Sequence, residues 1–139
     1  KIAAEAWEPV SELPAWQWVA ENCELPADSE LKSFDFELFW LARFALEQLA
    51  HNEFLKRFTE MLSAQVGKTV TILGYVAWVI KNRPASLGWY TDTGINAKHD
   101  FKTKILPALE ACKPVAPLLP PERSKKNNTL IQFGFMNFC

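Results

Sequence analysis

The chain has 139 residues, of which 49% are hydrophobic and 22% charged, the balance of one globular domain and not of a disordered segment. The formal net charge is −1, so charge alone does not favour nucleic-acid binding, although residues 1–60 hold 12 acidic and 5 basic side chains and residues 61–139 hold 4 and 10. Three widely spaced cysteines without a CxxC pair indicate neither a disulfide framework nor a zinc cluster, and no apolar run is long enough to span a membrane. We therefore expect a soluble intracellular protein. Because the basic side chains gather in the second half, we expect anionic partners to bind there.

The first fifty residues predict two amphipathic helices. Ser11-Glu12-Leu13-Pro14 is a typical helix start, with Ser11 as the N-cap and Pro14 in the first turn, and apolar residues then recur every three or four positions. Residues 26–29 interrupt this helix, and helical periodicity returns from Phe34 to Gln48. The second helix carries a stripe of aromatic residues, which we interpret as core packing, with a ligand-stacking surface as the alternative.

The middle of the chain has the order of elements that surrounds a phosphate-binding loop. Residues 57–62 suit a strand about as well as a helix end, and the apolar run 70–80 is long enough for a buried helix of three turns; the order of the elements favours the strand. Between them lie Ser63, Ala64, Gln65, Val66, Gly67, Lys68 and Thr69. A strand, a loop ending in Gly-Lys-Thr and an apolar helix are the context of a P-loop, although Leu62 stands where the full motif has its first glycine.

The chemistry of such a loop requires these residue types together. Backbone N–H groups and the helix N-terminus direct partial positive charge at the β-phosphate, and Gly67 permits the close approach of the backbone. Lys68 would reach the β- and γ-phosphate oxygens, and Thr69 would offer its hydroxyl to Mg²⁺. The segment from Ser63 to Thr69 therefore predicts a site for ATP and Mg²⁺.

The residues after the apolar run predict the end of that helix, one further helix, a loop and a basic turn. Pro84 should end the apolar helix, Asp92 or Thr93 should cap a helix that runs to Cys112, and Pro107 should kink that helix. A proline-rich loop, which should be extended, and a basic turn over residues 123–128 follow. The basic turn and three lysines of the preceding helix could contact DNA phosphates or could form an ordinary solvated surface. These lysines are Lys98, Lys102 and Lys104.

The segment from Ser63 to Thr69 resembles the deviant Walker A loop of the large terminase subunit of lambda-type tailed bacteriophages, where Ser-Ala-Gln-Val-Gly-Lys-Thr commonly stands in place of a loop that begins with glycine. Residues 9–26 look like that family's N-terminal helix, residues 87–109 resemble its second strand and the following helix, and residues 129–133 resemble the next strand. Trp40 and Arg43 precede the loop by about twenty residues, where the family carries an aromatic residue and an arginine near the adenine. The resemblance therefore implies that both side chains contact the base.

The resemblance also implies a fold and a division of the chain. The fold would be an α/β P-loop NTPase of the RecA-like (ASCE) type, a parallel sheet flanked by helices. Residues 1–53 would form an aromatic-rich helical segment packed on the ATPase core, and residues 54–139 the first part of an ATPase domain that continues past the end of this sequence.

The implied function is that of a motor which hydrolyses ATP to package double-stranded DNA into a procapsid. Its implied partners are the DNA, a small terminase subunit, the portal protein and further copies of itself. The motor would work in the host cytoplasm at the portal vertex of the procapsid, and no membrane partner is implied.

Two departures from the family pattern keep other functions open. Leu62 replaces the lysine that usually precedes the loop, and no apolar strand ending in Asp-Glu follows Thr129, so the catalytic residues stay unassigned. We therefore expect this chain to bind nucleotide with little turnover. The alternatives are another P-loop DNA translocase or helicase, and a non-catalytic interaction module derived from a P-loop domain.

Overall fold

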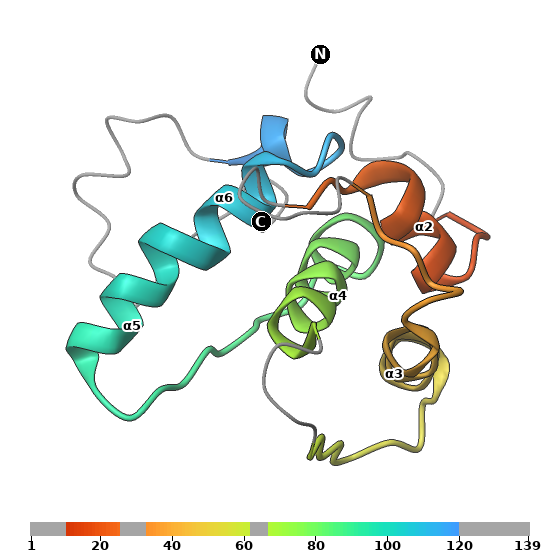
Figure 1. Ribbon diagram of the computed structural model, residues 1–139, viewed down its shortest axis with the longest axis horizontal. Coiled ribbons are helices and arrows are strands. Elements are labelled where there is room, and N and C mark those ends of the chain that lie inside the picture. The colour runs from red at the N-terminus through yellow and green to blue at the C-terminus, as the bar shows by residue number, and fades with distance from the viewer. Residues whose placement is uncertain (1–10, 26–32, 62–66, 120–139) are drawn as a thin grey trace.

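The computed structural model describes residues 11–25, 33–61 and 67–119, and these ranges fold into packed helices (Figure 1). Over these ranges the backbone forms no strand and only two isolated antiparallel bridges, Cys23 with Cys112 and Glu24 with Ser33. The strand predicted for residues 57–62 is wrong over its described part, 57–61, and residues 87–91 are likewise irregular. The strand at 129–133 lies outside the described residues, and the parallel sheet stays a prediction.

The segment 54–61 shows why a short apolar pattern did not make a strand. Phe54 and Met61, two of its largest apolar side chains, are 92% and 91% exposed. A strand gains its stability from pairing and from burying one face, and neither occurs here within the described residues. The local pattern of apolar residues is therefore not enough to predict a strand in this segment.

Helix α2 (Ala15–Asn22) confirms the first predicted helix but begins later than expected. The N-cap is Pro14, not Ser11, whose hydroxyl instead accepts a hydrogen bond from the N–H of Leu13 at 3.3 Å. The N–H of Ala15 donates to Nε2 of His51 at 3.2 Å, so a side chain from the next helix satisfies one of the N–H groups that a helix start leaves free.

Helix α3 (Trp40–His51) starts six residues after the predicted start at Phe34. Asp35 delays it, because its Oδ1 accepts hydrogen bonds from the N–H groups of Glu37 and Leu38, at 3.0 and 3.1 Å, and holds that segment in a turn. The interpretation of the aromatic residues as core packing is correct for Phe36, which is buried, but wrong for Trp40, which is 64% exposed.

Helix α4 (Lys68–Asn82) confirms the predicted apolar helix, and it lies at the centre of the described fold (Figure 1). It packs against α2, α3 and α6, and most residues of its second half are buried. At Gly74 the backbone approaches α2 so closely that a Cβ there would lie 3.0 Å from Cγ1 of Val19. The helix ends at Asn82, as Pro84 predicts.

The last predicted helix is present in three parts. Helix α5 (Gly94–Asp100) is capped by Thr93, whose hydroxyl accepts from the N–H of Asn96 at 3.2 Å, as expected. A π-helical turn, η1 (Phe101–Ile105), then leads into α6 (Leu106–Glu110). Pro107 lacks an N–H and its ring would clash with a carbonyl of the preceding turn, and the wider π-turn accommodates it in place of a simple kink.

The chain then turns back onto the core. Cys112 and Val115, both fully buried, follow α6, and a short 3₁₀ helix, η2 (Ala116–Leu118), comes next. The described part of the proline-rich segment is thus a series of turns and not the extended loop that its composition predicted. Residues 120–139, which include the basic turn, lie outside the described ranges.

Candidate functional site

The predicted phosphate site is described at its C-terminal edge, where α4 begins. Gly67 is the N-cap and has φ +80° and ψ 11°, a left-handed conformation that side-chain-bearing residues rarely adopt. Its carbonyl accepts hydrogen bonds from both the N–H and the hydroxyl of Thr71, each at 3.0 Å, which anchors the turn to the helix. Ser63, Ala64, Gln65 and Val66 lie outside the described residues.

Lys68 and Thr69 occupy the first two positions of α4. The helix is 15 residues long and has no acidic residue in its first turn. The first N–H groups of a helix have no acceptor within the helix, so these groups and the helix dipole present positive potential at this end, to which the Lys68 ammonium adds. Thr69 is exposed, so its hydroxyl is accessible to a hydrated cation. The residues described at this end suit a phosphate group with its magnesium ion.

Helices α3 and α4 pack against each other, and their C-terminal ends lie close together. There Nη1 of Arg83 donates to the carbonyl of Ala50 at 3.1 Å, and the ring centroids of His51 and Trp78 are 5.6 Å apart. Phe34, six residues before the start of α3, and Val70, in the first turn of α4, line the same small cavity.

Trp40 and Arg43, the predicted adenine-binding residues, lie in the first half of α3, away from the end that meets the C-terminal end of α4. Trp40 is exposed, so its ring is available for stacking.

Arg43 already has two partners. Its guanidinium carbon lies 4.1 Å from the ring centroid of Trp16 in α2, and its Nε lies 3.4 Å from Oε1 of Glu47. The i,i+4 spacing of Arg43 and Glu47 could have predicted the ion pair. No local signal could have predicted the contact with Trp16, because it joins two different helices.

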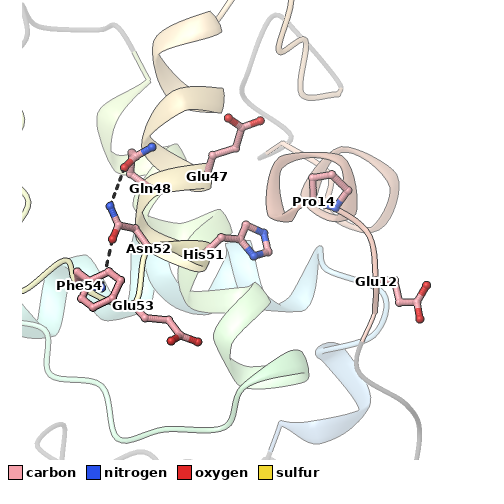
Figure 2. A pocket seen from close by; sticks show the side chains of 8 residues that line it. All are labelled: Glu12, Pro14, Glu47, Gln48, His51, Asn52, Glu53 and Phe54. Atoms are coloured by element: carbon pink, nitrogen blue, oxygen red, sulfur yellow. Dashed lines mark hydrogen bonds between the residues drawn. The ribbon is translucent and has the colours of Figure 1, made fainter.

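A large open pocket lies at the opposite end of α3 and does not suit a nucleotide (Figure 2). Its volume is about 740 Å³. Side chains from the C-terminal end of α3 and the following turn face residues that precede α2, and three of the lining residues are the carboxylates Glu12, Glu47 and Glu53. Such a lining repels phosphate. Within the described ranges no group of three or more His, Cys, Asp and Glu residues is arranged to hold a metal ion.

The other sequence-based candidates also have places in the described fold. Lys98, Lys102 and Lys104 are exposed, and Nζ of Lys104 pairs with Oδ1 of Asp100 at 2.6 Å. Cys112, the predicted end of the last helix, is buried and follows α6 without belonging to a helix. In the part of the chain that the structure describes, no helix has the length and apolar character needed to cross a bilayer.

Comparison with known proteins gives one match. The family model described as "Phage terminase large subunit gpA, ATPase domain" matches residues 41–136. The matched range is more than half of the chain, and it contains Arg43 and the whole segment from Ser63 to Thr69, whereas Trp40 lies just outside it. No curated protein and no solved structure matches the chain.

Proposed function

We propose that this chain, which belongs to the family of phage terminase large subunit ATPase domains, binds ATP with Mg²⁺ through Ser63 to Thr69, and that it serves a motor which packages double-stranded DNA. Membership in an ATPase family supports nucleotide use by the full protein. The packaging role extends that family assignment, and we propose with it the partners that the resemblance implies: the small terminase subunit, the portal protein and further copies of the chain at the portal of the procapsid. The α/β P-loop fold is part of the same proposal.

The conformation of Gly67 is the observation that carries the proposed site. A left-handed glycine lies directly before a lysine and a 15-residue apolar helix, and it turns the chain sharply where the first N–H groups of that helix lack acceptors within the helix. A phosphate at this position would accept hydrogen bonds from these groups while Lys68 neutralises its charge. The remaining residues of the loop, Ser63 to Val66, would complete the cradle.

Trp40 and Arg43 form the proposed base-binding side of the site. The exposure of the Trp40 ring supports this role, because an exposed ring is available for stacking. Arg43 sits one turn further along α3, with its guanidinium carbon 4.1 Å from the ring centroid of Trp16. A guanidinium held in this way can donate to a base without first losing its rotational freedom.

Calorimetric titration of ATP with Mg²⁺ into the 139-residue chain and its Lys68→Ala variant tests the site. Charge-assisted hydrogen bonds contribute about 1.5–3 kcal/mol, so affinity should fall by at least about tenfold. Lys81→Ala, at the C-terminal end of the same helix, is the matched control and should bind like the parent. Equal affinities for the parent and Lys68→Ala would exclude this site.

One observation favours a second candidate, the non-catalytic interaction module. Four large apolar side chains near the start of α3 are exposed: Leu38, Trp40, Leu41 and Phe44. Exposed apolar side chains that gather on one element are typical of surfaces that bind another protein. Failure of the parent chain to bind any nucleotide would support this function over the first.

A further inference from the structure

Two cysteines that are far apart in the sequence meet in the core. Cys23 follows α2, Cys112 follows α6, and the two residues face each other as an antiparallel bridge. Two backbone hydrogen bonds flank them, from the N–H of Glu24 to the carbonyl of Ala111 at 3.4 Å and from the N–H of Lys113 to the carbonyl of Asn22 at 3.0 Å.

This hydrogen-bond pattern makes Cys23 and Cys112 a non-hydrogen-bonded pair, the type in which facing side chains are closest. Cα atoms in such pairs are about 4.5 Å apart, and disulfides form when the Cα atoms are about 4.4–6.8 Å apart. Both cysteines are free thiols. The backbone therefore already holds the two sulfur atoms where a bond could join them.

The pair is almost completely buried, and a small cavity lies beside one of its two members. Cys23 is 6% exposed and Cys112 is fully buried. The hydrogen bond with Cys112, together with burial, raises the pKa of the Cys23 thiol well above its usual range. A cavity of about 20 Å³ touches Cys23 and is lined by apolar side chains of α4, among them Leu73 and Ala77. That volume admits one molecule of about the size of water.

We propose that Cys23 and Cys112 are a redox pair that forms an intramolecular disulfide when the folded chain meets a peroxide. Hydrogen peroxide first oxidises one thiol to a sulfenic acid and releases one water. The second thiol then attacks that sulfur, the S–S bond forms, and the hydroxyl leaves as a second water with the thiol proton. Two thiols and one peroxide thus give one disulfide and two waters.

The disulfide would fasten the ends of two helices on either side of α4. Both α2 and α6 pack against α4, so the bond would close a loop of roughly 90 residues around the central helix. Native geometry would change little, because the partners already face each other. The oxidised chain should therefore unfold at a higher temperature than the reduced chain.

The test uses the Cys139→Ser chain, which retains only these two cysteines. After treatment with hydrogen peroxide, intact mass spectrometry should show monomers that have lost two hydrogen atoms, and a reductant should restore the original mass. Thermal unfolding should show a Tm about 5–15 °C above that of the reduced protein. Because thiolate is the reacting form, oxidation should accelerate as the pH rises.

The control variant is Cys23→Ala in the same Cys139→Ser background. It should form no intramolecular bond and show no rise in Tm after peroxide treatment. Stable oxygen adducts or intermolecular dimers as the main product of the parent would overturn the proposal. So would a crosslinked monomer whose Tm is unchanged or lower, because the bond would then have distorted the pair that it joins.

Discussion

At the scale of single residues, Arg43 makes structural contacts and is also one of the two residues proposed to contact the base. The structural contacts join it to Trp16 and Glu47. These contacts do not use all five N–H donors of the guanidinium. A base could therefore bind to the same side chain, provided that it approaches from the edge that Glu47 leaves open.

Substitutions at Trp40 and Arg43 test the base contact. Trp40→Leu should weaken ATP binding by about tenfold, since stacking of a base on an aromatic ring contributes about 1–3 kcal/mol. Arg43→Lys keeps the charge but lacks the planar fork, so it should reduce the preference for ATP over GTP. Both affinities are measured by calorimetry with ATP and with GTP.

Phe54→Leu is the control for loss of an exposed aromatic side chain, because Phe54 lies beyond the opposite end of α3. It should bind both nucleotides like the parent. If Trp40→Leu and Arg43→Lys also bind like the parent, while circular dichroism shows intact helices, neither residue contacts the base and their role is structural.

At the scale of elements, the contact between α2 and α4 depends on a glycine. A Cβ at Gly74 would come within 3.0 Å of the Val19 side chain, which is itself fully buried. The two helices can lie this close only because position 74 has no side chain. The sequence showed an apolar helix here but not which of its faces would be covered.

Gly74→Leu should destabilise the chain by about 1–3 kcal/mol, because the new side chain overfills the contact with Val19. Chemical denaturation measures the free energy of unfolding. Gly94→Leu is the matched control, since no atom lies within 4 Å of a Cβ at Gly94, and it should change that free energy by less than about 0.5 kcal/mol. A Gly74→Leu chain as stable as Gly94→Leu would show that α2 moves away from α4 at no cost.

At the scale of the whole molecule, binding and hydrolysis should be separable. Phosphoryl transfer requires a positioned water, a metal held by acidic residues and a charge-stabilising arginine, and the sequence supplies only the phosphate-binding residues. The 139-residue chain should therefore release phosphate no faster than its Lys68→Ala variant, even with saturating ATP and Mg²⁺. A colorimetric phosphate assay makes this comparison. Rapid turnover that Lys68→Ala abolishes would place a catalytic carboxylate within these residues.

The sequence by itself determined the features that depend on a few neighbouring residues. The apolar run predicted α4, Pro84 predicted its end, Thr93 was one of two predicted caps, and Pro107 marked the break in the last helix. Each follows from a local hydrogen bond or from local backbone sterics, so no distant contact was needed. The segment from Ser63 to Thr69 was likewise enough to indicate the terminase ATPase family, because that motif is specific in itself.

Only the tertiary structure decided which distant groups meet. The contact of Arg43 with Trp16 and the pairing of Cys23 with Cys112 join segments that no local pattern connects. The irregular backbone of residues 54–61 has the same origin, because strand formation depends on a partner that the sequence of the segment does not specify. Periodicity states which residues are apolar, whereas the partner of each buried face depends on how all the helices pack together.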